Sequence, residues 1–119
     1  VQSMSKDAIV FALSNPEPEI YPSDALTAGA RIVATGRSDF ANQVNNAVVF
    51  PSVLRALLDL RAKTLTEDIL VGIANAIASL VDAAHLKENY IVPKVNDPRL
   101  LPVVSSTIKN SIGKQVAEA

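Results

Sequence analysis

The sequence predicts an α/β fold with a short parallel sheet followed by helices. A continuous apolar run at residues 8–13 and the short stretch "RIVATG" at residues 31–36 are typical of strands, and a short helical pattern separates them. A strand–helix–strand unit of about 30 residues places its two strands parallel. The second half of the chain has apolar residues at three- and four-residue spacing, which is typical of amphipathic helices.

The elements of the first half follow in order. The apolar run at residues 9–13 predicts a strand buried on both faces, and the proline-rich stretch at 14–22 prevents regular pairing and predicts an exit loop. Residues 23–28 are expected to form a short helix, with Ser or Asp at its start and Gly29 just past its end. Residues 31–34 are expected to form the second strand, beside the first.

Two helices are expected in the middle of the chain. Residues 46–60 have helical periodicity, and Pro51 either kinks this helix or marks its true start. Residues 66–84 form one apolar face at helical spacing, with Thr66 or Thr64 as the N-cap.

The C-terminal part is expected to be irregular and then helical. Residues 89–102 are interrupted by prolines, which predicts a segment without regular structure. Residues 103–119 are expected to form the last helix, in which Gly113 is a weak point.

Composition excludes several classes of function. Eleven basic and twelve acidic residues give a net charge of -1, which offers no electrostatic basis for binding nucleic acid or anionic membranes. The absence of Cys excludes disulfides and thiolate chemistry, and a cytoplasmic location is the default expectation. No apolar run approaches the ~20 residues that a membrane-spanning helix requires. We also expect this chain to begin partway through a longer protein, because its first strand follows almost at once.

The sequence lacks the common motifs of metal and phosphate-binding sites. The single histidine, His85, lacks neighbouring Cys or a carboxylate cluster, and we interpret it as a surface or capping residue. The glycines are isolated at positions 29, 36, 72 and 113, so neither a dinucleotide-binding nor a P-loop motif is present.

Three asparagines are the candidate binding residues. Asn15 lies just beyond the first predicted strand, and Asn45 and Asn46 lie beyond the second strand and its loop. Ligands of open α/β sheets bind outside the carboxyl ends of the strands. An amide offers two donors and an acceptor without charge, which suits a carboxamide, a sugar hydroxyl or a carboxylate. The alternative for each residue is structural, because Asn favours turns and helix N-caps.

Three consecutive strings carry a family resemblance. They are "IVFALSNPEPEIYP", "ARIVATGRSDFANQVNN" and "VVFPSVLRALLDLRAKTLTEDI", and weaker similarity continues through "YIVPKVNDPRL". Together they resemble the malic enzymes of the short bacterial and archaeal type. The resemblance implies that residues 1–119 are the C-terminal portion of a Rossmann-like NAD(P)-binding domain, containing about two strands of its parallel sheet.

The resemblance also implies an activity. Malic enzymes oxidatively decarboxylate malate to pyruvate and carbon dioxide, and they reduce NAD or NADP with Mg or Mn bound. In the family pattern the Tyr and Lys acid/base residues, the metal ligands and the Gly-rich turn precede the segment that this chain resembles. No catalytic or metal-binding residue is therefore assigned here, and the 119 residues alone are expected to be inactive.

Site residues carry over from the resemblance by position. Asn15 and Asn46 match residues that contact malate, whereas Asn15, Gly36 and Asn45 match residues on the nicotinamide side of the cofactor. Arg37 and Asp39 belong to the short-type signature, where bracing of the loop is the favoured interpretation.

Two alternatives stay open at this point. One is a malolactic-type relative that shares the fold and releases lactate, and the other is a stand-alone binding or interaction module without catalytic activity. The expected partners of the main interpretation are malate or pyruvate, the remainder of a malic enzyme chain, and further copies in a homo-oligomer.

Overall fold

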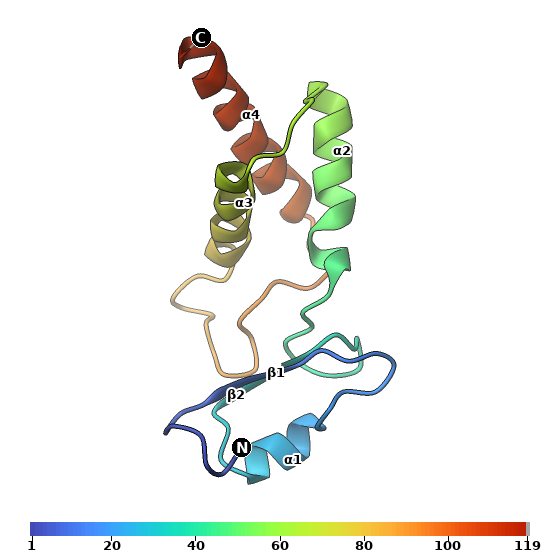
Figure 1. Cartoon of the computed structure of the whole chain (residues 1–119), viewed down its shortest axis with the longest axis vertical. Helices are drawn as coiled ribbons and strands as arrows, with labels where there is room; N and C mark the ends of the chain where they lie inside the picture. The colour runs from blue at the N-terminus through green and yellow to red at the C-terminus, as the bar shows by residue number, and fades with distance from the viewer. Residues whose placement is uncertain (119) are drawn as a thin grey trace. The chain divides into compact units, whose positions relative to one another are not determined.

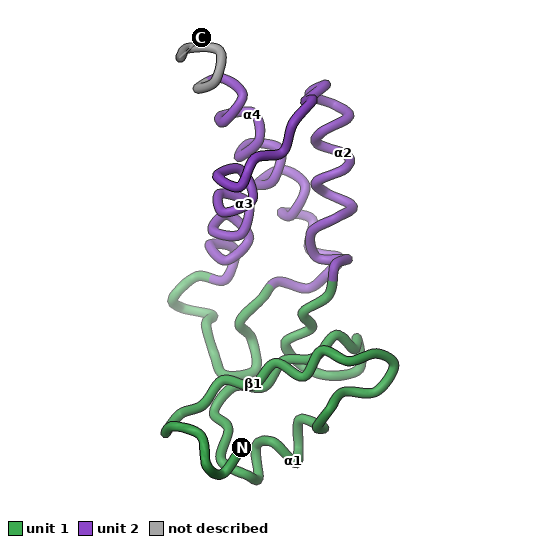
Figure 2. Tube along the Cα trace, in the orientation of Figure 1, with its two compact units in different colours: residues 1–45, 82–92 green, residues 46–81, 93–119 purple. Residues whose placement is uncertain are grey.

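The computed structural model describes residues 1–118, with side chains described through Gly113. Two compact units are present (Figure 2): a strand unit of residues 1–45 and 82–92, and a helical unit of residues 46–81 and 93–119. The elements are β1 (Ile9–Ala12), α1 (Pro22–Thr27), β2 (Ile32–Thr35), the 3₁₀ helix η1 (Asn46–Val48), α2 (Phe50–Leu60), α3 (Glu67–Ser79) and α4 (Leu100–Glu118). The predicted α/β class is confirmed, whereas the assignment of all 119 residues to one domain stays a prediction.

The strand unit contains a two-stranded parallel sheet (Figure 1). Ile9 pairs with Ile32, and Ala12 pairs with Thr35, so the two strands end together. Helix α1 lies between them in sequence and packs its one buried residue, Ala25, with Ala30 and Val33. This confirms the predicted strand–helix–strand unit and places both strand ends at one edge of the sheet.

One face of β1 differs from the prediction. Ile9, Phe11 and Leu13 are exposed, by 58%, 50% and 45%, although the apolar run predicted burial on both faces. Alternate residues of a strand point to opposite faces, so these three side chains lie on the same face. On the other face, Val10 packs with the α1 core. The run is therefore apolar on both sides while only one side is covered within the described residues.

Helix α1 begins earlier than predicted. Its first residue is Pro22, and its N-cap is Tyr21, whose side chain makes no capping hydrogen bond. Proline suits the first helical position because its fixed φ is helical and the N–H it lacks would have no helical partner. The prediction of Ser23 or Asp24 as the start was therefore wrong by one or two residues.

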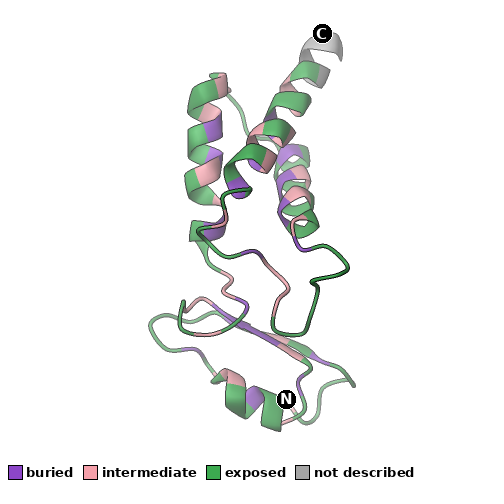
Figure 3. Cartoon of the chain, turned by 180° about the vertical axis from the view of Figure 1, so that it is seen from behind, coloured by how far each residue is buried: buried purple, intermediate pink, exposed green. Residues whose placement is uncertain are grey.

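The helical unit buries one apolar core between α2, α3 and α4 (Figure 3). Each helix contributes residues at three- and four-residue spacing, which places them on one face. The largest of the fully buried side chains are Ile73, Val104 and Ile108, and Ala56 of α2 is also fully buried.

Pro51 marks the start of α2 rather than a kink. It occupies the first turn, where the N–H that proline lacks would have no partner within the helix. The N-cap is Val49, and no side chain caps this helix. Asn46 instead begins η1, where its carbonyl accepts from the N–H of Val49 at 2.9 Å. Helix capping, the structural alternative for Asn46, does not apply to α2.

The ends of α3 and α4 follow local hydrogen bonds. The side chain of Thr66 accepts from the N–H of Ile69 at 3.3 Å, which confirms the predicted N-cap of α3. That helix ends at Ser79, short of the predicted residue 84, and Asp82 accepts from the N–H of His85 in a turn beyond it. A side chain that bonds nearby backbone in this way favours a turn over continued helix.

Helix α4 starts at Leu100, before the predicted residue 103. Pro102 therefore lies inside the helix, but within the first turn, where proline is tolerated. The carbonyl of Asp97 accepts from the N–H of Leu100, and its carboxylate accepts from the N–H of Arg99. These bonds satisfy backbone donors that have no partner within the helix.

Candidate functional site

The candidate site lies at the edge of the sheet where β1 and β2 end. Asn15 follows β1 and Gly36 follows β2, and a Cβ placed on Gly36 would lie 3.4 Å from the side-chain oxygen of Asn15. The two residues are therefore neighbours. Gly36 has no Cβ, and such a residue allows another group to come closer to its backbone than other residues do.

Asn45 joins the same group of residues. Its side-chain nitrogen donates to the carbonyl oxygen of Gly36 at 3.0 Å, and Gln43 donates to that oxygen at 3.4 Å. The structure thus brings together three of the four predicted residues within the strand unit. Asn15 and Asn45 are exposed, as a ligand contact requires.

Asn46 belongs to the helical unit, and its side chain is exposed at the start of η1. Within the described part of the chain, we find no protein group that hydrogen-bonds to this side chain. That Asn46 and Asn15 both contact malate stays a prediction.

Thr35 shapes the loop that carries Gly36 and Asn45. Its side chain is fully buried, and its hydroxyl accepts from the N–H of Arg37 at 3.2 Å. Its backbone accepts from Val44 at 2.7 Å and donates to Asn42 at 3.3 Å. The loop therefore leaves β2 and returns beside its last residue, which brings Asn45 back to Gly36.

A charged pair lies beside this edge. Arg37 donates from Nε and Nη2 to the two carboxylate oxygens of Asp39, at 2.9 and 2.8 Å. These hydrogen bonds lower the pKa of Asp39 and raise the pKa of Arg37, so both groups are charged at neutral pH. In the loop after β1, hydrogen bonds from Ser14 lower the pKa of Glu19 in the same way.

Asn42, the third asparagine of the loop, has a structural role that was not predicted from the sequence. Asn42 is buried with a φ of 56°, and its side-chain nitrogen donates to the carbonyls of Val33 at 3.0 Å and Glu88 at 2.8 Å. Its side-chain oxygen accepts from the N–H of Ile91 at 3.0 Å. Asn tolerates the left-handed conformation better than most residues, and this was the local signal available.

The site offers neutral hydrogen-bonding groups rather than metal ligands or a nucleophile. Among the side chains that the structure describes, no three of His, Cys, Asp or Glu gather in a group suited to a metal ion. His85 is exposed and pairs with Asp82 at 2.6 Å, which confirms its surface position. No described helix is long and apolar enough to cross a membrane. The hydrogen-bonding groups of an amide suit the carboxamide of a nicotinamide or a carboxylate.

The family described as "Malic enzyme, NAD binding domain" matches residues 1–117. The chain belongs to this malic enzyme family. It is 49% identical over 108 residues to the bifunctional malic/malolactic enzyme of Bacillus subtilis, covering 91% of this chain and 26% of that protein. It is 40% identical over 123 residues to the NADP-dependent malic enzyme of Rhizobium meliloti, covering 91% of this chain and 16% of that protein.

A solved structure of malic enzyme from Pyrococcus horikoshii Ot3 has the same fold. The TM-score is 0.87 at 44% identity, and the similarity covers 96% of this chain and 26% of the other. The chain thus spans between 16% and 26% of the length of these malic enzymes and lies in their NAD-binding region.

Proposed function

We propose that this chain acts as part of an enzyme that converts malate to pyruvate and carbon dioxide while reducing NAD or NADP. One observation carries the proposal: in a malic enzyme NAD-binding domain, exposed amides follow both parallel strands at the edge where open α/β sheets bind ligands. The family supplies the reaction, and the strand ends supply groups of suitable chemistry.

Asn15 and Asn46 are the proposed malate contacts. A neutral amide donates to a substrate carboxylate and orients it, and such a charge-assisted bond is stronger than a neutral one. It adds no titrating group to the site. The exposure of both side chains supports this role.

Asn15, Gly36 and Asn45 are the proposed contacts on the nicotinamide side. Gly36 permits close approach, and the bond from Asn45 to its carbonyl holds the loop in place. A bound NAD(P)⁺ would supply the hydride acceptor for the oxidation of malate at C2 to oxaloacetate, in which the C2 hydroxyl loses its proton. Cleavage of the C3–C4 bond then releases carbon dioxide, and protonation at C3 gives pyruvate.

Mg or Mn is the proposed metal of the complete enzyme. The described residues present no cluster of ligands for it, so we assign it to other residues of the enzyme. The contribution of this chain is to bind and orient substrate and cofactor, which lowers the entropic cost of reaching the reactive geometry.

A malolactic reaction is the second candidate. Its support is the name of the Bacillus subtilis relative, a bifunctional malic/malolactic enzyme. That reaction yields lactate and carbon dioxide from malate with no net reduction of NAD. Product analysis therefore separates the two reactions, because only the first accumulates pyruvate and NADH in equal amounts.

The proposed partners are the remainder of a malic enzyme chain and further copies in a homo-oligomer, and the proposed location is the cytoplasm. Exposed apolar side chains support a covering partner on each unit. In the strand unit they lie on one face of β1, and in the helical unit α2 exposes Phe50, Leu54 and Leu58 at four-residue spacing. Surfaces of this kind are usually buried by other parts of a protein.

A chimera tests the proposal. The matched 108-residue segment of the Bacillus subtilis relative is replaced by the corresponding part of this chain, and malate-dependent NADH or NADPH formation is measured with Mg or Mn. We expect turnover with release of pyruvate. A folded chimera without turnover, judged by circular dichroism and gel filtration, would contradict the proposal and favour a non-catalytic binding module.

A further inference from the structure

Arg37 connects the loops that follow β1 and β2. Besides its two bonds to Asp39, its Nη1 donates to the carbonyl oxygen of Pro16 at 3.5 Å, the long end of the hydrogen-bond range. Pro16 directly follows Asn15 in the chain. The guanidinium of Arg37, the residue after Gly36, therefore contacts the backbone next to Asn15.

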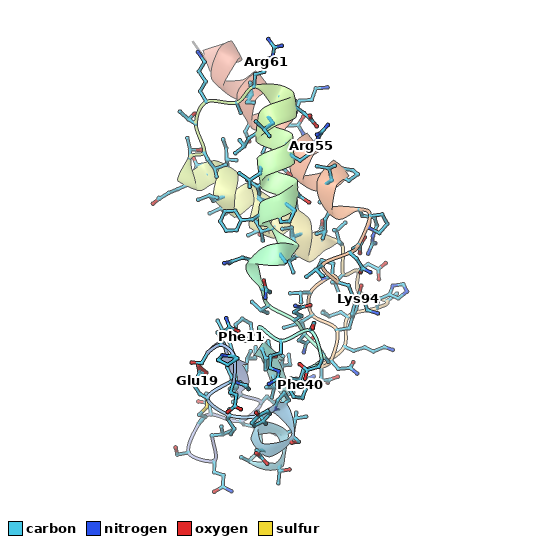
Figure 4. The ribbon with its side chains drawn as sticks, turned by 90° about the vertical axis from the view of Figure 1, so that its right-hand side faces the viewer. Phe11, Glu19, Phe40, Arg55, Arg61 and Lys94 are labelled. Carbon is cyan, nitrogen blue, oxygen red and sulfur yellow. The ribbon has the colours of Figure 1, made fainter. Side chains whose placement is uncertain are left out.

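Aromatic contacts hold the same guanidinium from another side. It lies 5.5 Å from the centre of the Phe40 ring, a cation–π distance (Phe40 is labelled in Figure 4). Phe40 in turn meets Tyr21 edge to face at 6.0 Å, and Tyr21 ends the loop after β1. The two loops thus meet at both Pro16 and Tyr21.

We propose that Arg37 is a positioning residue that holds the amide of Asn15 against the edge of Gly36. Asp39 fixes the plane of the guanidinium, which leaves Nη1 to hold the backbone at Pro16. The side-chain oxygen of Asn15 lies 3.4 Å from the position that a Cβ on Gly36 would take. A small displacement of the loop that carries Asn15 would therefore change which ligand groups fit beside Gly36. Only the consequence for catalysis rests on the proposed function.

Lysine does not replace arginine in this arrangement. The planar fork of arginine donates to two carboxylate oxygens and a carbonyl at once, whereas an ammonium is a point charge that cannot keep all three bonds and the ring contact. Arg37→Lys and Arg37→Gln are therefore both expected to release the loop of Asn15. Arg31 offers a matched control in the strand unit, because it makes exposed ion pairs with Asp7 and Glu88 at the start of β2.

The first test measures the position of Asn15 directly in the 119-residue chain. The side-chain amide of Asn15 is followed by ¹⁵N–¹H NMR in Arg37→Gln, Arg37→Lys and Arg31→Gln. We expect both Arg37 variants to shift this amide signal, and Arg31→Gln to leave it in place. An unchanged Asn15 signal in either folded Arg37 variant would overturn the proposal.

The second test measures the consequence in the chimera. Arg37→Gln is expected to lower kcat/KM for malate about tenfold, because a misplaced substrate contact is costly, while Arg31→Gln changes it less than about twofold. In an Asn15→Ala background, Arg37→Gln is expected to have no further effect, because Arg37 acts through Asn15. Two losses that multiply would instead show independent action and overturn the proposal. An inactive parent chimera contradicts the proposed function alone, and the NMR result still decides the role of Arg37.

Discussion

The side-chain oxygen of Asn42 accepts a hydrogen bond from the backbone N–H of Ile91 at 3.0 Å, across 49 positions of the chain. The nitrogen of the same amide donates to the carbonyls of Val33 and Glu88. One buried side chain thereby joins strand β2 to residues 82–92, which belong to the strand unit although they come from the second half of the sequence. These three hydrogen bonds hold the segment around residue 90 beside the loop of the candidate site.

Asn42→Ala is predicted to destabilise the strand unit by about 2–4 kcal/mol. It removes three hydrogen bonds to buried or half-buried groups, each worth roughly 0.5–1.5 kcal/mol, and it places alanine at positive φ. Asn42→Gly loses the same bonds without the backbone strain, so its cost is expected to be about 1 kcal/mol smaller. Urea unfolding and amide exchange at Ile91 measure these effects.

Ser38→Ala is the control for Asn42, because Ser38 is an exposed residue of the same loop. Its unfolding free energy is expected to stay within about 0.5 kcal/mol of the parent chain. An Asn42→Ala variant as stable as this control would show that the hydrogen bonds of Asn42 contribute nothing to stability.

Two helical glycines are predicted to respond differently to alanine. At Gly113 of α4 an added Cβ meets nothing within 4 Å, so Gly113→Ala should stabilise the helical unit by about 0.5–1 kcal/mol. At Gly72 of α3 the Cβ would lie 3.1 Å from the methyl of Thr107, whose hydroxyl bonds the carbonyl of Val103 at 2.8 Å. That bond resists rotation of Thr107, so Gly72→Ala should bring no gain. Equal gains in thermal midpoint from both variants would refute the predicted clash.

Asp97 is predicted to make the stability of the helical unit depend on pH. Hydrogen bonds from Arg99 lower the pKa of Asp97 below its ordinary 3.8, so its stabilisation is present above that value and is lost as the pH falls through the folded pKa. Asp97→Asn should therefore cost about 1–2 kcal/mol at pH 7 and much less at pH 2–3. Unfolding free energies of both proteins across this range provide the measurement.

Asp59→Asn is the matched control for Asp97. It breaks an exposed ion pair with Arg55 within α2, which is worth less than about 1 kcal/mol. The predicted role of the Asp97 carboxylate is contradicted if Asp97→Asn lowers the unfolding free energy at pH 7 as little as Asp59→Asn does. It is also contradicted if the loss for Asp97→Asn is the same at pH 2–3 as at pH 7.

Local patterns predicted most of the fold. Thr66 caps α3 through a hydrogen bond to Ile69 three residues away, and such short-range signals can be read directly from the sequence. The hydrogen bonds of Asn42 to Glu88 and Ile91 could not be predicted, because these partners lie 46 and 49 positions further along the chain. The exposed face of β1 was missed because an apolar run shows what a strand suits, and not what covers it.

The candidate site was predicted in part for the same reason. The parallel strands place Asn15 and Gly36 at one edge, which follows from the order of elements. The bond from Asn45 to Gly36 depends on how the loop folds back on Thr35, and no local pattern indicated this. Helix capping was the structural alternative to substrate binding for Asn46, and the Val49 N-cap of α2 excludes it for that helix.

Asn46 provides the most direct test that the amides of this chain contact malate. In the chimera, Asn46→Ala is predicted to lower kcat/KM for malate about 10- to 100-fold, the cost of one charge-assisted hydrogen bond. Asn46→Asp should lower it further, because a carboxylate would face a carboxylate. The deciding measurement is malate kinetics of Asn46→Asp alongside its thermal midpoint: the proposed contact predicts a stable protein with severely reduced kcat/KM, and a stable Asp variant with full activity would contradict it.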